Sequence, residues 1–266
     1  MLALPTRTSD EVKDFKGAVL KLISTAYGED ASRTCLKDAN ALQALRVQML
    51  ELKPTADAEA AEAQAALLTY VLALTQLQPL IGAEVREQQA LAFTWRSAFD
   101  SDKAKLSDLR WEQCGALLNL AAVLSSRAAL QQMGSVDEIK LAAKHCMMAA
   151  GVLQLALDTH PHAAFASATA DVSDASLGAL RQLMVAQAQA CFCEKAARDN
   201  LRPATQAQLC MGARQSYEQV GFHCLISDTD DSLLTIAYLH HPLIAHLHHP
   251  LIAHFHHPLI AHFVTP

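Results

Sequence analysis

The stretch WEQCGALLNLAAVLSSRAA, from Trp111 to Ala129, decides the fold class of this chain. Alanine and leucine supply most of the chain's apolar residues, and both favour helices. The stretch holds no proline, and with its flanks it predicts a helix over residues 107–131. The fold of the whole chain then depends on how many similar helices lie before and after this stretch.

Helical patterns of similar length lie on both sides of this stretch. The first is predicted to begin at Ser9–Asp10, which would cap an amphipathic run containing Val12, Phe15 and Val19. Residues 80–106 are less regular and hold the aromatic residues Phe93, Trp95 and Phe99, which are assigned to core packing. The remaining predicted helices cover residues 34–52, 56–77, 137–157, 173–200 and 204–220, the second of these ending before Pro79.

Helices of this length with short connections must fold back on one another as antiparallel hairpins. The sequence therefore predicts an all-α chain, a stack of helical hairpins similar to a tetratricopeptide solenoid, although no 34-residue repeat is present. We also allow for a short β element near the N-terminus. Nine glycines and nine prolines in 266 residues are too few for a many-turned β-sandwich.

Composition excludes several function classes. The formal net charge of −6 argues against a general nucleic-acid binder. Seven scattered cysteines are typical of a reducing compartment, and neither a signal peptide nor an apolar run of 18 residues is evident. The expected location is the cytoplasm. No phosphate-cradling loop, nucleophile elbow or HExxH motif occurs, so we expect no enzyme and no cofactor.

The last part of the chain differs from everything before it. Residues 240–247 read HHPLIAHL, and HHPLIAHF follows at 248–255 and again at 256–263. Proline every eighth residue forbids a regular helix. We therefore divide the chain at residue 220 and interpret 221–266 as an irregular histidine-rich tail, disordered or an artefact of the gene model, that packs little against the body.

Four stretches resemble the BRO domain family of the Alix type. They are FTWRSAFD at 93–100, the opening stretch at 111–129, DEIKLAAKHCMMAAGVL at 137–153 and LMVAQAQACFCEKAARDN at 183–200. Their order and spacing agree with the family over residues 8–217. The resemblance implies a partial, boomerang-shaped BRO domain over residues 1–220 whose arm is incomplete.

The resemblance also implies a function and a partner. BRO domains are non-enzymatic adaptors that dock the C-terminal amphipathic helix of an ESCRT-III subunit in endosomal and multivesicular-body sorting. A cytoplasmic protein that associates peripherally with endosomal membranes is therefore expected.

The family's binding residues fall on six positions of this chain. The key phenylalanine falls on Phe192, and an isoleucine and a leucine of the next helix fall on Thr205 and Leu209. The acidic residue falls on Asp137, and two lysines fall on Lys140 and Lys144. Threonine in place of isoleucine removes apolar area from the patch, at a cost to binding on the order of 1 kcal/mol.

Other interpretations stay open. Phe192 and Leu209 suit a buried core as well, and Lys140 and Lys144 suit a solvated face. The chain could instead be a scaffold in ambient-pH signalling that uses the same docking interaction, or a nonfunctional truncated fragment. A metal-binding role for the histidine tail is a further alternative.

Overall fold

The computed structural model describes residues 1–10, 12, 14–51, 56–80, 91–159, 165 and 168–226, with side-chain surroundings given as far as Val220. The predicted tail therefore lies outside the described residues, and both its weak packing and the division at residue 220 stay predictions. The elements are β1 (Thr8–Ser9), α1 (Phe15–Tyr27), α2 (Glu29–Thr34), α3 (Leu36–Leu50), α4 (Asp57–Leu80), β2 (Phe93–Arg96), β3 (Lys103–Leu106), α6 (Leu109–Ala129), α7 (Val136–Thr159), η1 (Ala170–Val172), α9 (Asp174–Arg198) and α10 (Pro203–Ile226).

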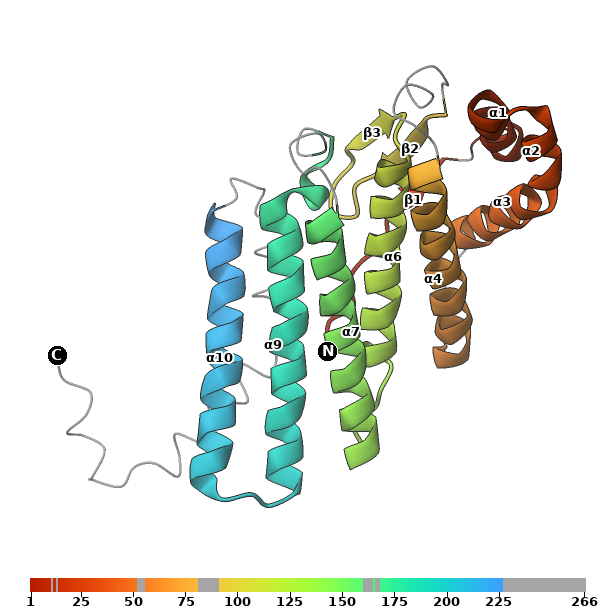
Figure 1. The fold of residues 1–266 in the computed structure, drawn as a ribbon. Coiled ribbons are helices and arrows are strands. Elements are labelled where there is room, and N and C mark those ends of the chain that lie inside the picture. Colours follow the sequence, from red (N-terminus) through yellow and green to blue (C-terminus); the bar gives the residue numbers. More distant parts are fainter. Residues whose placement is uncertain are drawn as a thin grey trace.

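Five long helices make up most of the body. Figure 1 shows α4, α6, α7, α9 and α10 standing side by side in their order along the chain, with α1–α3 at one end of the row. Each packs mainly on its neighbours in this row. The all-α prediction with antiparallel hairpins is confirmed.

A small sheet lies beside one end of α6. Its strand order is β1–β2–β3, and both pairs are antiparallel, with Thr8 opposite Arg96 and Trp95 opposite Ala104. The short N-terminal β element is thus present, and the irregular segment around the aromatic residues forms a hairpin. Trp95 is fully buried, as expected for core packing.

Several helix limits differ from prediction, among them the end of α10, which lies at Ile226 and not at residue 220. The first helix begins at Phe15 and not after Ser9–Asp10, because β1 takes Ser9 into the sheet; the helix is capped by Asp14, whose side chain accepts from the Gly17 amide at 3.0 Å. Helix α4 continues through Pro79 to Leu80. A proline in the last turn removes one hydrogen bond, and the helix ends directly after it.

Helix α6 is the centre of the core. Nearly all of its residues from Leu109 to Ser125 are buried, including the polar residues Glu112, Gln113 and Asn119. A helix that is buried on every side sits between two layers of neighbours. Here α4 and α7 lie on its flanks, while the sheet and the N-terminal segment cover further parts of it.

The outer face of α10 is largely polar as far as Val220. Met211, 61 % exposed, is its one large apolar side chain exposed by more than a third among those described. Arg214 and Glu218 form an ion pair beside it, with 2.7 Å between Nε and Oε1. As far as Val220, α10 therefore resembles a capping helix more than an exposed core element.

Candidate docking surface

The predicted charged residues lie on the outward face of α7. This helix starts with a capping box: Glu138 Oε2 accepts from the Ser135 amide at 2.9 Å, while Ser135 Oγ accepts from the Glu138 amide at 3.2 Å. Asp137, Lys140 and Lys144 follow at spacings of three and four, and all three are exposed. The start of α7 thus presents a row of charges to solvent.

Two of these charges neutralise each other. Asp137 Oδ1 lies 3.0 Å from Lys140 Nζ in an exposed ion pair. Lys144 has no acidic partner within ion-pair distance in the part of the chain that the structure describes. A ligand carboxylate would therefore find Lys144 available, whereas it would have to compete with Asp137 for Lys140.

The predicted apolar residues lie at similar levels on the two helices of the α9–α10 hairpin. Gln182 Nε2 donates to Gln219 Oε1 at 2.6 Å, which fixes the register of these antiparallel helices. In that register Phe192 lies level with Leu209. Phe192 is 40 % exposed, Leu209 is half-buried and Thr205 is exposed. A phenylalanine exposed to this extent is unusual for a core residue and typical of an interface.

The exposed faces of α7 and α9 lie on the same side of the row. The N-terminal residues cover the opposite side, where the Met1 and Cys191 sulfurs are 3.9 Å apart and Met1 packs on the buried Ala142 and Ala188. On α9, Cys191 and Phe192 are successive residues and so differ by about 100° in direction. Because the two helices are antiparallel, Phe192 near the end of α9 lies level with Lys140–Lys144 near the start of α7.

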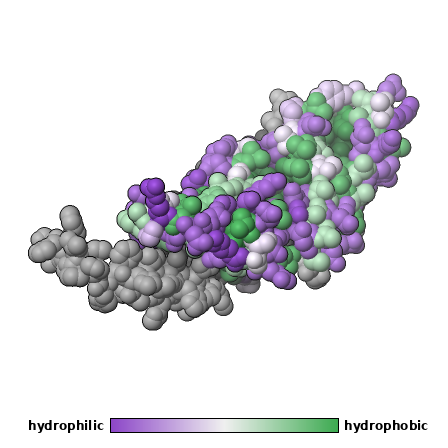
Figure 2. Space-filling model, turned by 90° about the horizontal axis from the view of Figure 1, so that it is seen from below, coloured by the Kyte–Doolittle hydropathy of each residue, from purple (hydrophilic) through white to green (hydrophobic). Residues whose placement is uncertain are grey.

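Two glycines leave this surface without a side chain at their positions. A methyl group added at Gly151 of α7 or Gly212 of α10 would meet no atom within 4 Å. Both glycines therefore face open space. From below, the molecule is elongated and shows separate apolar areas between polar ones (Figure 2).

The opposite side of the row is built by side chains that hold the N-terminal segment. Gln187 of α9 accepts from the Leu2 amide at 2.7 Å and donates to the Leu2 carbonyl at 3.1 Å. Asn119 of α6 makes the same pair of bonds to Arg7, at 2.7 and 3.0 Å. Two buried amide side chains thus replace the backbone partners that a neighbouring strand would offer.

Arg7 itself continues into the core. Its Nε lies 2.9 Å from Asp171 Oδ2, and both side chains are fully buried. The guanidinium lies over Trp95 and Trp111, 5.5 and 4.9 Å from the ring centroids. The stacked aromatic faces and the carboxylate together compensate a charge that burial would otherwise make very costly.

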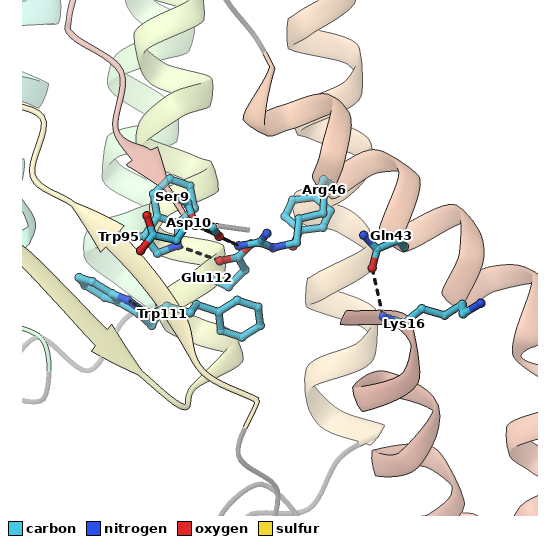
Figure 3. Close-up of polar contacts among 10 residues, drawn as sticks. Ser9, Asp10, Lys16, Gln43, Arg46, Trp95, Trp111 and Glu112 are labelled. Atoms are coloured by element: carbon cyan, nitrogen blue, oxygen red, sulfur yellow. Dashed lines mark hydrogen bonds and ion pairs between the residues drawn. The ribbon is translucent and has the colours of Figure 1, made fainter. Parts of the chain in front are cut away.

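A second buried ion pair lies nearby (Figure 3). Arg46 Nε donates to Glu112 Oε1 at 2.9 Å, and Tyr70 Oη and Trp95 Nε1 each donate to the same carboxylate at 2.8 Å. Burial raises the pKa of Tyr70 well above its ordinary value, and the Glu112 charge adds to this. Glu112 therefore joins α3, α4, β2 and α6 through one carboxylate.

The sequence interpretation overlooked these roles. Glu112, Asn119 and Gln187 all lie within the quoted motifs, but only the resemblance drew attention to them. The available signal was their position: polar residues in the middle of apolar helices must be hydrogen-bonded when buried.

The described residues offer little to other kinds of site. A cavity of about 180 Å3 lies between Met1, Met133, Cys191 and Tyr217, with a mainly apolar lining. Across the described ranges no three histidine, cysteine or acidic side chains are placed to share a metal ion. Among the helices described, none is both long and apolar enough to cross a bilayer.

Comparison with known protein families gives a match over almost the whole chain. Residues 1–262 match the BRO1-like domain family. The chain is 30 % identical over 238 residues to human programmed cell death 6-interacting protein, covering 86 % of this chain and 27 % of that protein. It is 28 % identical to the vacuolar protein-sorting protein BRO1 of Gibberella zeae, with 82 % and 21 % covered. The chain thus spans about a quarter of the length of these relatives.

Solved structures agree with this match. The ALIX BRO1 CHMP4C complex superimposes with a TM-score of 0.75 at 28 % identity, covering 89 % of this chain and 68 % of that one. A structure described as the basis for endosomal targeting by the Bro1 domain gives 0.68 at 18 % identity, over 86 % and 61 %, and supports the fold alone.

Proposed function

We propose, from the premise that this chain belongs to the BRO1-like domain family, that it docks the C-terminal amphipathic helix of an ESCRT-III subunit. The family is one of interaction modules and not of enzymes, which confirms that part of the sequence interpretation. Its relatives include a vacuolar sorting protein, and a solved neighbour holds CHMP4C, an ESCRT-III subunit. The proposed setting is peripheral association with endosomal membranes.

The exposed phenylalanine on α9 carries the proposal. Phe192 is partly solvated although the helix around it is largely buried. The register of the hairpin sets Leu209 of α10 level with it and Thr205 about one turn away. Lys144 adds a positive charge at the same level. An amphipathic helix with apolar anchors and acidic neighbours matches this combination.

Fluorescence polarisation with a labelled peptide of the CHMP4C C-terminal helix tests the proposal. We expect micromolar or weaker binding, because Thr205 thins the apolar patch. Phe192→Ala should lose about 1–2 kcal/mol, as for a secondary hot spot, and Phe192→Asp should abolish binding. Leu72→Asp, an exposed leucine on α4, is the matched control. Unchanged binding by Phe192→Asp would show that the site is wrong.

A scaffold in ambient-pH signalling is the second candidate. The chain is 28 % identical to the pH-response regulator protein palA/RIM20 of Aspergillus oryzae, over 91 % of this chain and 28 % of that protein. The docking interaction would be the same, so the peptide experiment tests both settings. If the chain binds no peptide at any accessible concentration while a version carrying the relatives' further helices does, the chain is a nonfunctional fragment.

A further inference from the structure

The outward face of α7 changes character beyond Lys144. Met148 and Leu155 are 37 % and 45 % exposed, and Met147 is exposed beside them. These residues continue the line of Lys140 and Lys144, since spacings of three, four and seven keep one helix face. Large apolar side chains gathered on one exposed face indicate a contact surface more than chance exposure.

The neighbouring part of α9 adds a cation. Helix α7 ends at Thr159 and α9 begins at Asp174, so the antiparallel pair places Val185 level with Met148 and Arg181 a turn further, toward Leu155. Arg181 Nε is buried and has no hydrogen-bond partner among the residues that the structure describes. A buried charged donor without an acceptor is costly, and a carboxylate brought by a partner would relieve that cost.

We infer that the docking surface extends along α7 and α9 from Lys144 to Leu155, and that its occupant is an acidic amphipathic helix longer than the Phe192 patch alone requires. The inference rests on the proposed function and deepens it. The apolar side of the helix covers Met148, Leu155 and Val185 as well as Phe192. One acidic side chain of the helix meets Lys144, and another meets Arg181.

The dimensions set the length of the partner. Lys140 and Leu155 are fifteen residues apart on one helix, about 22 Å along its axis. A docked helix must therefore keep its apolar stripe over roughly fifteen residues, four turns. Gly151 lies midway and lets the partner backbone approach. Methionines are adaptable contacts, which suits a surface that accepts leucine-like anchors of varied shape.

Charge favours a peptide over an anionic membrane as the occupant. The surface offers two separate cations at its ends, with apolar residues between them, and the chain as a whole carries a net charge of −6. Anionic lipid surfaces attract clusters of basic residues. Two cations set apart by about two to three turns instead match acidic residues placed at intervals along a helix.

Two peptides of different length separate this inference from the proposed function. The short one is about ten residues of the CHMP4C C-terminal helix, enough to reach Phe192 and Leu209, and the long one is about twenty residues. For the long peptide we expect Met148→Asp and Leu155→Asp each to weaken binding at least fivefold, and the short peptide to bind these variants like the parent. Arg181→Gln should lower the salt dependence of long-peptide binding.

Leu68→Asp, at another exposed leucine on α4, is the control and should change neither peptide. Because Leu155 and Leu68 are both exposed, circular dichroism should show all variants folded. If Phe192→Asp abolishes binding while Met148→Asp and Leu155→Asp leave the long peptide unaffected, the extension is wrong and the proposed function stands. If neither peptide binds, both are overturned. If Leu155→Asp alters binding to phosphatidylserine vesicles and not to the long peptide, the occupant is a membrane and the inference is wrong.

Discussion

Arg46 and Glu112 lie 66 positions apart in the sequence, yet Arg46 Nε lies 2.9 Å from Glu112 Oε1 in the core, with both side chains almost completely buried. The pair links the N-terminal helices to the central row. Phe15 and Phe93 flank the guanidinium at 5.7 and 5.6 Å from their ring centroids. Three donors, from Arg46, Tyr70 and Trp95, converge on the Glu112 carboxylate.

Replacing that carboxylate should destabilise the fold strongly. Glu112→Gln leaves the Arg46 charge buried without its partner, and breaking a buried pair in this way costs about 3–5 kcal/mol. Urea unfolding followed by circular dichroism should show a lower midpoint. Glu62→Gln, at an exposed site on α4, should change little. Equal midpoints for the two variants would mean that the pair adds nothing to stability.

The anchoring of the N-terminal segment can be tested at Asn119. Its side chain satisfies both the amide and the carbonyl of Arg7, so Asn119→Ala leaves two buried backbone groups unpaired, at about 1–3 kcal/mol each. The temperature of thermal unfolding should fall by several degrees. Gln208→Ala on the exposed side of α10 serves as control, and a matching loss there would contradict the assigned role.

Thr205→Ile should strengthen docking. The residue is exposed, so the added methyl groups become buried only when the ligand helix covers them. A gain on the order of 1 kcal/mol, roughly fivefold in Kd, is expected from the added apolar area. Thr205→Val adds less apolar area than Thr205→Ile, so its peptide affinity should increase less in the same titration. Weaker binding by both variants would place Thr205 outside the contact.

Acidification should weaken the fold through His145. This residue is almost fully buried on α7, and burial, followed by the positive charge of Arg127, lowers its pKa below the ordinary value of about 6.5. The unfolded chain then binds the proton more readily than the folded one. Stability is therefore complete above about pH 6.5 and falls as the pH drops toward the folded pKa.

His145→Asn separates this effect from other titrations. The difference between unfolding midpoints at pH 7.5 and pH 5.5 should be smaller in the variant than in the parent. Asp57, which forms an ion pair with Arg127 at 2.9 Å, is left in place in both. The same difference in both proteins would remove His145 as the cause.

A chain ending at Ile226 tests the prediction that the histidine-rich tail packs little against the body. Ile226 is the last residue of helix α10, which the structure describes. The shortened chain should unfold at the same temperature as the full chain and bind the peptide equally well. A lower unfolding temperature would show that residues beyond 226 belong to the folded unit.

The sequence predicted the long helices because their periodicity is local information. It misplaced the start of α1 because Ser9, a good helix cap, pairs instead with Trp95 in the sheet, and that partner lies 86 positions away. The exposed position of Phe192 came only through family resemblance, since a phenylalanine in an alanine-rich helix otherwise indicates a core. The ion pair of Arg7 with Asp171 forms only when distant parts of the chain fold together, so no single stretch of sequence predicts it.

The binding of Leu2 by Gln187 has a consequence for how the protein is made. The two residues are separated by 185 positions, so the first residues to leave the ribosome wait for a partner synthesised near the end of the described body. At 5–20 residues per second this delay is roughly 10–40 s. Contacts of such high sequence separation slow folding. Leu4 and Arg7 can already bond to Ser125 and Asn119 once α6 has been synthesised, whereas Leu2 lacks its partner until α9 is complete. The N-terminal segment is therefore fixed to the body in two steps, and its first residues are fixed last.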